Sequence, residues 1–270
     1  MYRVSPSPVN PTPGKGGGFS GYFPVDARGI MEGCLQEAAV IRASLLRPVL
    51  LAALLGGGGP AAWALRGDPP GASLALPVPA AGPATLDGAL KARRTTRELL
   101  GPALSRGEAA QLLWSAQGEN RPGRRTVPSA HATYPLGLYL VTEGSPTLET
   151  GAYRYQPGAH ALRPVGKQGV AALLGAIQGM QPWIVKAPAV FVVAGRPLKI
   201  SRREPAASFD YTFWECGAAS QALLLQAEAL GLGAGTASGV DLAAVGAALG
   251  LPKEERALVL LPVGRVKPGK

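Results

Sequence analysis

A run of arginines and threonines is the strongest candidate for chemistry in this chain. Residues 93–97 read Arg-Arg-Thr-Thr-Arg and follow a short predicted helix over residues 86–92. Guanidinium groups offer planar forks of donors that match phosphate oxygens, and threonine hydroxyls add neutral donors. Three arginines within five residues cannot all point one way, so at most two should converge on one anion. The run predicts a phosphate site, and spacing alone leaves a solvated basic turn as the alternative.

Several common chemistries lack their residues in this sequence. The only cysteines are Cys34 and Cys216, and the only histidines are His131 and His160. These counts exclude a disulfide framework, a cysteine zinc ribbon and a three-histidine metal site. The chain holds no Walker A motif, no G-x-S-x-G elbow and no G-x-G-x-x-G after a predicted strand. Cys216 falls inside a predicted helix, which favours a buried, inert thiol. We therefore expect no metal site.

The net charge of +10 favours an anionic ligand or surface. Basic residues are densest between Lys91 and Arg125. Nucleic-acid modules usually interleave basic residues with exposed aromatic ones or present a basic recognition helix. Trp114 is the one aromatic residue in this stretch, and it falls in an apolar stripe. We therefore expect no nucleic-acid partner, and association with an anionic membrane surface stays open.

The first 84 residues differ in composition from the rest. Residues 1–30 carry runs of proline and glycine without apolar periodicity, which predicts disorder, and Met31 is a second candidate start. Residues 49–65 hold no charge and follow two arginines, and near their end Ala62-Trp63-Ala64 is a pattern after which signal peptidase cleaves. Residues 31–65 therefore predict an export signal and a periplasmic protein. A membrane tether and a flexible cytoplasmic arm are the alternatives. Residues 66–84 are a predicted linker.

Residues 85–268 carry the periodic patterns of one folded domain. Ser105 and Glu108 form a capping box at the start of one helix. Predicted helices cover residues 86–92, 105–118, 169–180 and 213–230, and a short one follows Asp241. Predicted strands cover residues 136–142, 153–155, 161–162, 189–194 and 257–263. Helices and strands are mixed without regular βαβ units, which favours an α+β domain around one central sheet.

Several short motifs occur one after another between residues 74 and 267. Besides the run at 93–97 they are Leu112–Gly118 (LLWSAQG), Pro128–Ala130 with Tyr134–Leu136, Gly151–Tyr155 (GAYRY), Gln181–Ile184, Glu215–Gly217 with Gln221, Leu230–Gly233 (LGLG) and Pro262–Arg265. Each motif is short, but their order and spacing resemble the nitroreductase family of FMN-dependent enzymes. The likeness is greatest to its SagB-type branch of thiazole/oxazole dehydrogenase-like proteins.

The resemblance implies a nitroreductase-like flavoprotein fold, in which helices flank a central mixed or antiparallel sheet. It also implies an intertwined homodimer with FMN at the interface. The cofactor-binding residues carried over from the family are Arg93, Arg94, Thr95, Arg97 and Arg265 at the phosphate and ribityl chain, Gln117 at the ribityl or ring edge, Pro128, Ser129 and Ala130 at the ring from the other subunit, and Ser238 and Gly239 near flavin N5. The implied activity moves hydride between a donor such as NAD(P)H, FMN and a small organic acceptor or substrate. No catalytic side chain is assigned, because the flavin carries the redox chemistry.

The sequence departs from the branch at substrate-side positions. Arg203-Glu204 stands where the branch has a Lys-Tyr pair associated with proton removal in azoline oxidation. Ala218 replaces a histidine, and Ala222 replaces an asparagine. These differences predict a diverged substrate pocket. They leave as the alternative a flavin-binding or accessory protein of the same fold without turnover.

Overall fold

The computed structural model describes residues 72–267 apart from 176, 178, 198–206 and 238. The expectations for residues 1–71, including the export signal or tether at 31–65, lie outside the described residues. Those for Arg203-Glu204 and Ser238 lie outside them as well. Among the helices that the structure describes, none has both the length and the apolar composition of a membrane span.

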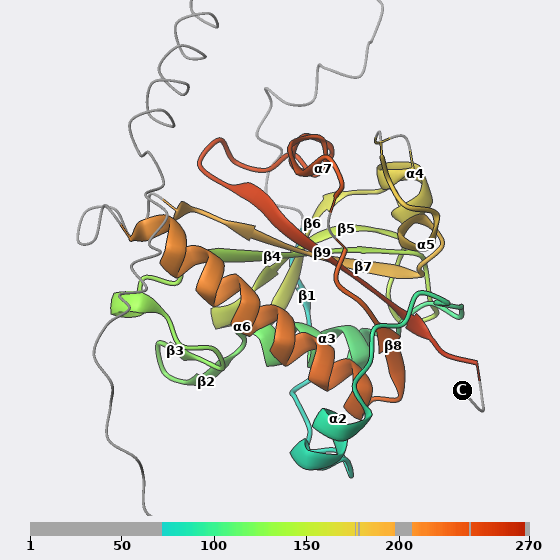
Figure 1. Cartoon of the computed structure of the whole chain (residues 1–270), viewed down its shortest axis with the longest axis horizontal. Helices are drawn as coiled ribbons and strands as arrows, with labels where there is room; N and C mark the ends of the chain where they lie inside the picture. The colour runs from blue at the N-terminus through green and yellow to red at the C-terminus, as the bar shows by residue number, and fades with distance from the viewer. Residues whose placement is uncertain (1–71, 176, 178, 198–206, 238, 268–270) are drawn as a thin grey trace, which may run out of the picture. The chain divides into compact units, whose positions relative to one another are not determined.

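A seven-stranded sheet forms the centre of the domain (Figure 1). Its strand order is β1-β6-β5-β4-β7-β9-β8, and every described pair of neighbours is antiparallel. The strands are β1 (Leu74–Ala75), β4 (Leu136–Thr142), β5 (Gly151–Gln156), β6 (Ala161–Gly166), β7 (Ala189–Gly195), β8 (Leu232–Ala234) and β9 (Arg256–Arg265). A separate hairpin pairs β2 (Glu119–Arg121) with β3 (Arg124–Arg125). The predicted sheet flanked by helices is confirmed, and β1 is a strand within the predicted linker.

Helices cover both faces of the sheet (Figure 1). Successive side chains of a strand point to opposite faces, so Leu138 and Phe191 pack with α3 (Arg106–Gln117) and α6 (Ser208–Ala229). Tyr139 and Val192 belong to the core on the other face. That face is covered by α4 (Val170–Leu174), α5 (Pro182–Val185) and α7 (Leu242–Ala248). Strands buried on both faces explain the continuous apolar runs of β4 and β7.

The helix boundaries follow local signals in most places. The predicted capping box of α3 is confirmed, since Ser105 Oγ accepts from the Glu108 amide and Glu108 returns the bond. Helix α2 (Leu86–Ala92) has its predicted bounds. The predicted helix over 169–180 is wrong beyond residue 174. Gly175 caps α4, and Gly179 has a φ of 76°, a left-handed conformation that cannot continue a helix.

Candidate functional site

The arginine and threonine run of residues 93–97 lies at the β8 edge of the sheet. The Thr96 amide donates to the carbonyl of Ala234 on β8 over 2.9 Å. Four residues after Thr96, Leu100 exchanges two backbone hydrogen bonds of 2.9 Å with Arg265 at the end of β9. These bonds hold the run as an extended segment beside β8. Its side chains are exposed except those of Arg93 and Thr96, which are half-buried.

Two segments that are distant in the sequence, α5 and the residues after β8, meet at this run. The guanidinium carbon of Arg97 lies 5.7 Å from the centre of the Trp183 ring, which α5 supplies. A Cβ added at Gly235 would come within 3.2 Å of the Thr95 methyl group and 3.3 Å of the Trp183 ring. Glycine at 235 therefore allows the close approach of the run to the segment after β8. Trp183 belongs to one of the motifs that carry the family resemblance, but the resemblance assigns it no role in cofactor binding.

Arg265 is engaged in a bidentate ion pair. Its two terminal nitrogens donate to the carboxylate of Glu108 over 2.6 and 2.9 Å. Burial alone would raise the pKa of Glu108, but hydrogen bonds from Arg265 and Ser105 hold it below its ordinary value. Arg265 thus lies close to the run because its backbone pairs with that of Leu100. Its guanidinium is directed to Glu108. Its part in phosphate binding stays a prediction.

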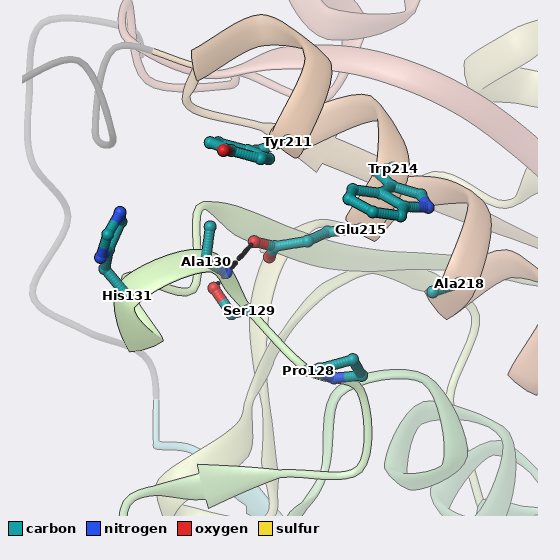
Figure 2. A pocket seen from close by; sticks show the side chains of 8 residues that line it. All are labelled: Pro128, Ser129, Ala130, His131, Tyr211, Trp214, Glu215 and Ala218. Carbon is teal, nitrogen blue, oxygen red and sulfur yellow. Dashed lines mark hydrogen bonds between the residues drawn. The ribbon is translucent and has the colours of Figure 1, made fainter. Parts of the chain in front are cut away.

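The segment Pro128–Ala130 lines a separate cavity of about 480 Å³ (Figure 2). Helix α6 forms the facing wall, with Tyr211 and Trp214 opposite the segment and Glu215 reaching across to it. Ala218, where the SagB-type branch has histidine, also lines this cavity. Its methyl group offers no acid–base chemistry there. The volume falls in the range of small-molecule sites.

Glu215 holds this segment in place. One of its carboxylate oxygens accepts from the Ser129 hydroxyl and from the Ala130 amide, both over 2.9 Å. The Ser129 hydroxyl oxygen in turn accepts from the Tyr134 amide over 2.8 Å. The segment continues through three residues with positive φ, namely His131 at 52°, Ala132 at 53° and Tyr134 at 47°. Such conformations are costly for residues other than glycine, so the anchoring by Glu215 maintains a strained turn.

Cys216, beside this anchor, is a buried thiol with 5% of its surface exposed. Burial raises its pKa to about 11. The predicted burial of Cys216 is confirmed, and at neutral pH its sulfur is protonated and a poor nucleophile.

The other predicted residues fall in different places. Gln117 is buried at the end of α3, where its carbonyl oxygen accepts from Arg125 Nη1 over 2.6 Å. It borders a third, polar cavity rather than either group described above. Gly239, with a φ of 75°, lies next to Gly179 in the turn between α4 and α5. The roles predicted for Gln117 and Gly239 stay predictions.

Two groups of predicted site residues therefore lie at different ends of α6 (Figure 1). The cavity of Pro128–Ala130 faces residues 211–218 of the helix. The run at residues 93–97 borders β8, which directly follows the C-terminal end of α6 at Ala229. At 1.5 Å per residue, Glu215 and Ala229 are about 21 Å apart along the helix.

Comparisons with known proteins give a consistent picture. A family model described as the nitroreductase family matches residues 90–265. A provisionally named nitroreductase of Methanocaldococcus jannaschii is 32% identical over 181 residues, which cover 67% of this chain and 90% of the relative. A crystal structure of a provisionally named nitroreductase from Ralstonia eutropha is 25% identical, with a TM-score of 0.64, and covers 72% of this chain and 90% of that one. The Escherichia coli microcin synthetase McbBCD complex contains a chain that shares the fold at 18% identity, with a TM-score of 0.54 over 85% of this chain and 82% of that one.

Proposed function

The chain belongs to the nitroreductase family of oxidoreductases, and from this premise we propose that it is an FMN-dependent enzyme. It would move hydride between a donor such as NAD(P)H, FMN and a small organic acceptor or substrate, as the SagB-type likeness of its motifs suggests. The observation that carries the proposal is the cluster formed by residues 93–97, Trp183 and Gly235.

The donor set at residues 93–97 suits a flavin phosphate. Arg93 and Arg97 supply guanidinium forks, and the exposed Thr95 supplies a hydroxyl donor beside them. The backbone bond to Ala234 fixes the course of the segment before any ligand binds. Preorganised donors cost little conformational entropy on binding. In this proposal the run holds the phosphate and the start of the ribityl chain.

The cavity of Pro128–Ala130 suits the edge of a flat ring. Small residues on two of its walls, Ala130 and Ala218, let a planar group approach the backbone closely. Trp214 and Tyr211 supply apolar surface that would exclude water. A bound flavin supplies hydride acceptance and donation. The residues of the chain orient the reactants and shield them, and this needs no acid–base side chain of their own.

We infer a homodimer from the separation of the two groups. Helix α6 exposes a row of apolar side chains, Phe209 at 43%, Phe213 at 50% and Trp214 at 77%. Exposed apolar rows of this kind mark interaction surfaces. We infer that a second copy covers this row. Its Pro128–Ala130 segment would then complete the flavin site that begins at residues 93–97 of the first copy.

Sedimentation velocity tests the dimer. The wild type should sediment as a dimer, and Phe213→Glu should shift it to a monomer because a charge would be buried in the interface. Val78→Glu is the matched control, since Val78 is 86% exposed and lies outside α6. A monomeric wild type, or a Phe213→Glu variant that remains dimeric, would contradict this interface.

The visible spectrum of the purified full chain tests the flavin. Bound FMN should give flavin absorption bands, and anaerobic addition of NADPH or NADH should bleach them. The double variant Arg93→Ala/Arg97→Ala should weaken FMN binding, since each charge-assisted contact contributes about 1.5–3 kcal/mol. Arg121→Ala/Arg124→Ala on the β2–β3 hairpin is the control with two exposed arginines removed. Equal FMN affinity of both double variants and the wild type would refute the phosphate assignment.

A flavin-binding protein without turnover is the second candidate. Ala218 favours it, because the branch's histidine position lies on the cavity wall and here carries only a methyl group. This candidate predicts bound FMN that neither NADPH nor NADH reduces under anaerobic conditions, while dithionite still bleaches it. Bleaching by a nicotinamide would exclude it.

A further inference from the structure

A third cavity, of about 270 Å³, contains an unusual excess of hydrogen-bond donors. Three guanidinium groups line it, from Arg125 on β3, Arg154 on β5 and Arg196 just after β7. We call it the arginine pocket. Gln117 from the end of α3 borders it as well, with the aromatic ring of Tyr134. It includes Gln117, for which the family resemblance predicts a flavin contact, but neither residues 93–97 nor the cavity lined by Pro128–Ala130. A ligand bound there would be separate from the flavin proposed above.

Only part of the positive charge is balanced within the fold. Glu255, whose side chain is 1% exposed, accepts from Arg154 over 2.6 Å and from two nitrogens of Arg196. Its other oxygen accepts from the Tyr139 hydroxyl over 2.6 Å. Both carboxylate oxygens of Glu255 are therefore engaged by Tyr139, Arg154 and Arg196. The lining of the arginine pocket thus contains three guanidiniums and no carboxylate, and Glu255 pairs with two of the three.

Arg125 has no such carboxylate. Its Nη1 donates to the amide oxygen of Gln117, and its guanidinium carbon lies 4.5 Å from the centre of the Tyr134 ring. No ion pair joins it to a carboxylate among the described residues, although the charges of Glu119 and Glu215 act on it from nearby. Burial lowers the pKa of Arg125, which reflects a cation that has lost part of its hydration. A partly buried cation without an anion is costly, so this position is suited to an external one.

Gln117 supplies an independent indication of a ligand. The residue is 1% exposed, and its Nε2 has no hydrogen-bond partner among the described residues. Buried polar groups in native proteins are almost always satisfied, and each exception calls for an explanation. A guanidinium carries five N–H donors, whereas the bonds described here use one of Arg125 and two of Arg196. The group that is missing from the arginine pocket is a hydrogen-bond acceptor.

We propose that the arginine pocket binds a small oxyanion, a carboxylate or phosphate group, held by Arg125 and the Nε2 of Gln117. The volume lies just below the range of pockets that bury drug-sized ligands, which favours a small anion over a nucleotide. Arg154 on β5 and Arg196 after β7 add positive charge to the lining. The Tyr134 ring closes one side, next to the segment that Glu215 anchors.

Isothermal titration calorimetry of the full chain tests the proposal, with succinate and phosphate as separate probes. One of the two should bind with a Kd below about 1 mM in chloride buffer, and the tighter probe identifies the group as carboxylate or phosphoryl. Arg125→Gln should weaken this binding about tenfold or more, because it removes a charge-assisted contact. Arg124→Gln, on the same strand but exposed, should bind as the wild type does. Arg93→Ala/Arg97→Ala should also retain binding. If the probe bound instead at the proposed flavin phosphate site, this double variant would lose the binding.

Gln117→Glu is a second, isosteric variant. Its added carboxylate oxygen would occupy the acceptor position itself, so the anion should no longer bind while the thermal midpoint stays equal or rises. Selenate soaked into wild-type crystals gives a measurement that depends on no variant, with an anomalous peak expected between Arg125 and Gln117. Absence of saturable binding of both probes by the wild type would overturn the proposal. So would binding that Arg125→Gln and Gln117→Glu leave unchanged, or a selenate map without that peak.

Discussion

Glu215 should control both the stability of the domain and the completeness of the proposed flavin site. A single oxygen of its buried carboxylate holds the Ser129 hydroxyl and the Ala130 amide. The segment they belong to passes into three residues with positive φ. Replacing Glu215 with alanine removes the acceptor of both bonds at once, so the strained turn should relax and the cavity lined by Pro128–Ala130 should change shape.

The magnitude follows from the two bonds. Hydrogen bonds to a charged acceptor contribute about 1.5–3 kcal/mol each. Ser129 is half-buried, so water can replace one of its bonds, and removing a buried carboxylate recovers part of its desolvation cost. We therefore expect Glu215→Ala to lose about 2–4 kcal/mol of unfolding free energy. Glu215→Gln keeps a neutral acceptor and should lose about 1–2 kcal/mol.

Urea unfolding followed by circular dichroism measures the first effect, and a fluorescence titration with FMN measures the second. FMN affinity should fall at least tenfold in Glu215→Ala, because Pro128–Ala130 is proposed to line the ring. Glu228→Ala, on the same helix but about 20 Å along its axis, is the control and should change neither quantity. A Glu215→Ala protein with wild-type stability would refute the anchoring. Lost stability with unchanged FMN affinity would instead show that this segment is not part of the flavin site.

Two further predictions concern stability. Glu255→Gln should lose about 3 kcal/mol in urea unfolding, the low end for a broken buried ion pair, because its two arginine partners keep 21% and 31% of their side chains exposed. Burial alone would raise the pKa of Glu255, but bonds from a tyrosine and two arginines hold it below its ordinary value. The stability advantage of the wild type should therefore be complete at neutral pH and be lost as the pH falls through the lowered pKa. The exposed Glu254→Gln is its control, and an equal loss in both would exclude this ion-pair explanation. Gly118→Ala should lose about 1–3 kcal/mol, because the added Cβ would lie 2.1 Å from the Trp114 ring and 2.6 Å from its carbonyl oxygen. Gly107→Ala in the first turn of the same helix has free space and should be neutral or stabilising, and a similar loss there would contradict the clash.

Local signals were sufficient for much of the fold. The strand over 136–142 and the α3 helix with its capping box could be predicted because their determinants lie within a few neighbouring residues. The start of α6 at Ser208 could not, since residues 208–212 have weak helix propensity. There Ser208 and Thr212 are buried, and the Thr212 hydroxyl donates to the Ser208 carbonyl over 2.8 Å. Tertiary packing therefore adds the first turn.

The site was less predictable because its key contacts join distant segments. The motif containing Glu215 could be found, but its role could not, since its partners lie 85 and 86 residues away. Trp183 likewise meets Arg97, which lies 86 residues earlier in the sequence (183 − 97). Gln117 and Arg125 are eight residues apart across the β2–β3 hairpin. A glutamine at a helix end facing an arginine beyond a tight turn is a signal that the sequence did contain.

The net charge of +10 shows why counting basic residues could not locate the ligand sites. Arg265 is directed to Glu108, and Arg154 and Arg196 are directed to Glu255, so these guanidiniums mainly stabilise the fold. Arg97 is exposed and lies over a tryptophan ring, and Arg125 is half-buried against an amide. A guanidinium that is not paired with a carboxylate can bind an anion without breaking an existing ion pair. By that criterion the groups around Arg97 and Arg125 are two places, among the described residues, that are suited to bind anions. They are far enough apart in the sheet order, at β8 and beside β5, to be occupied independently.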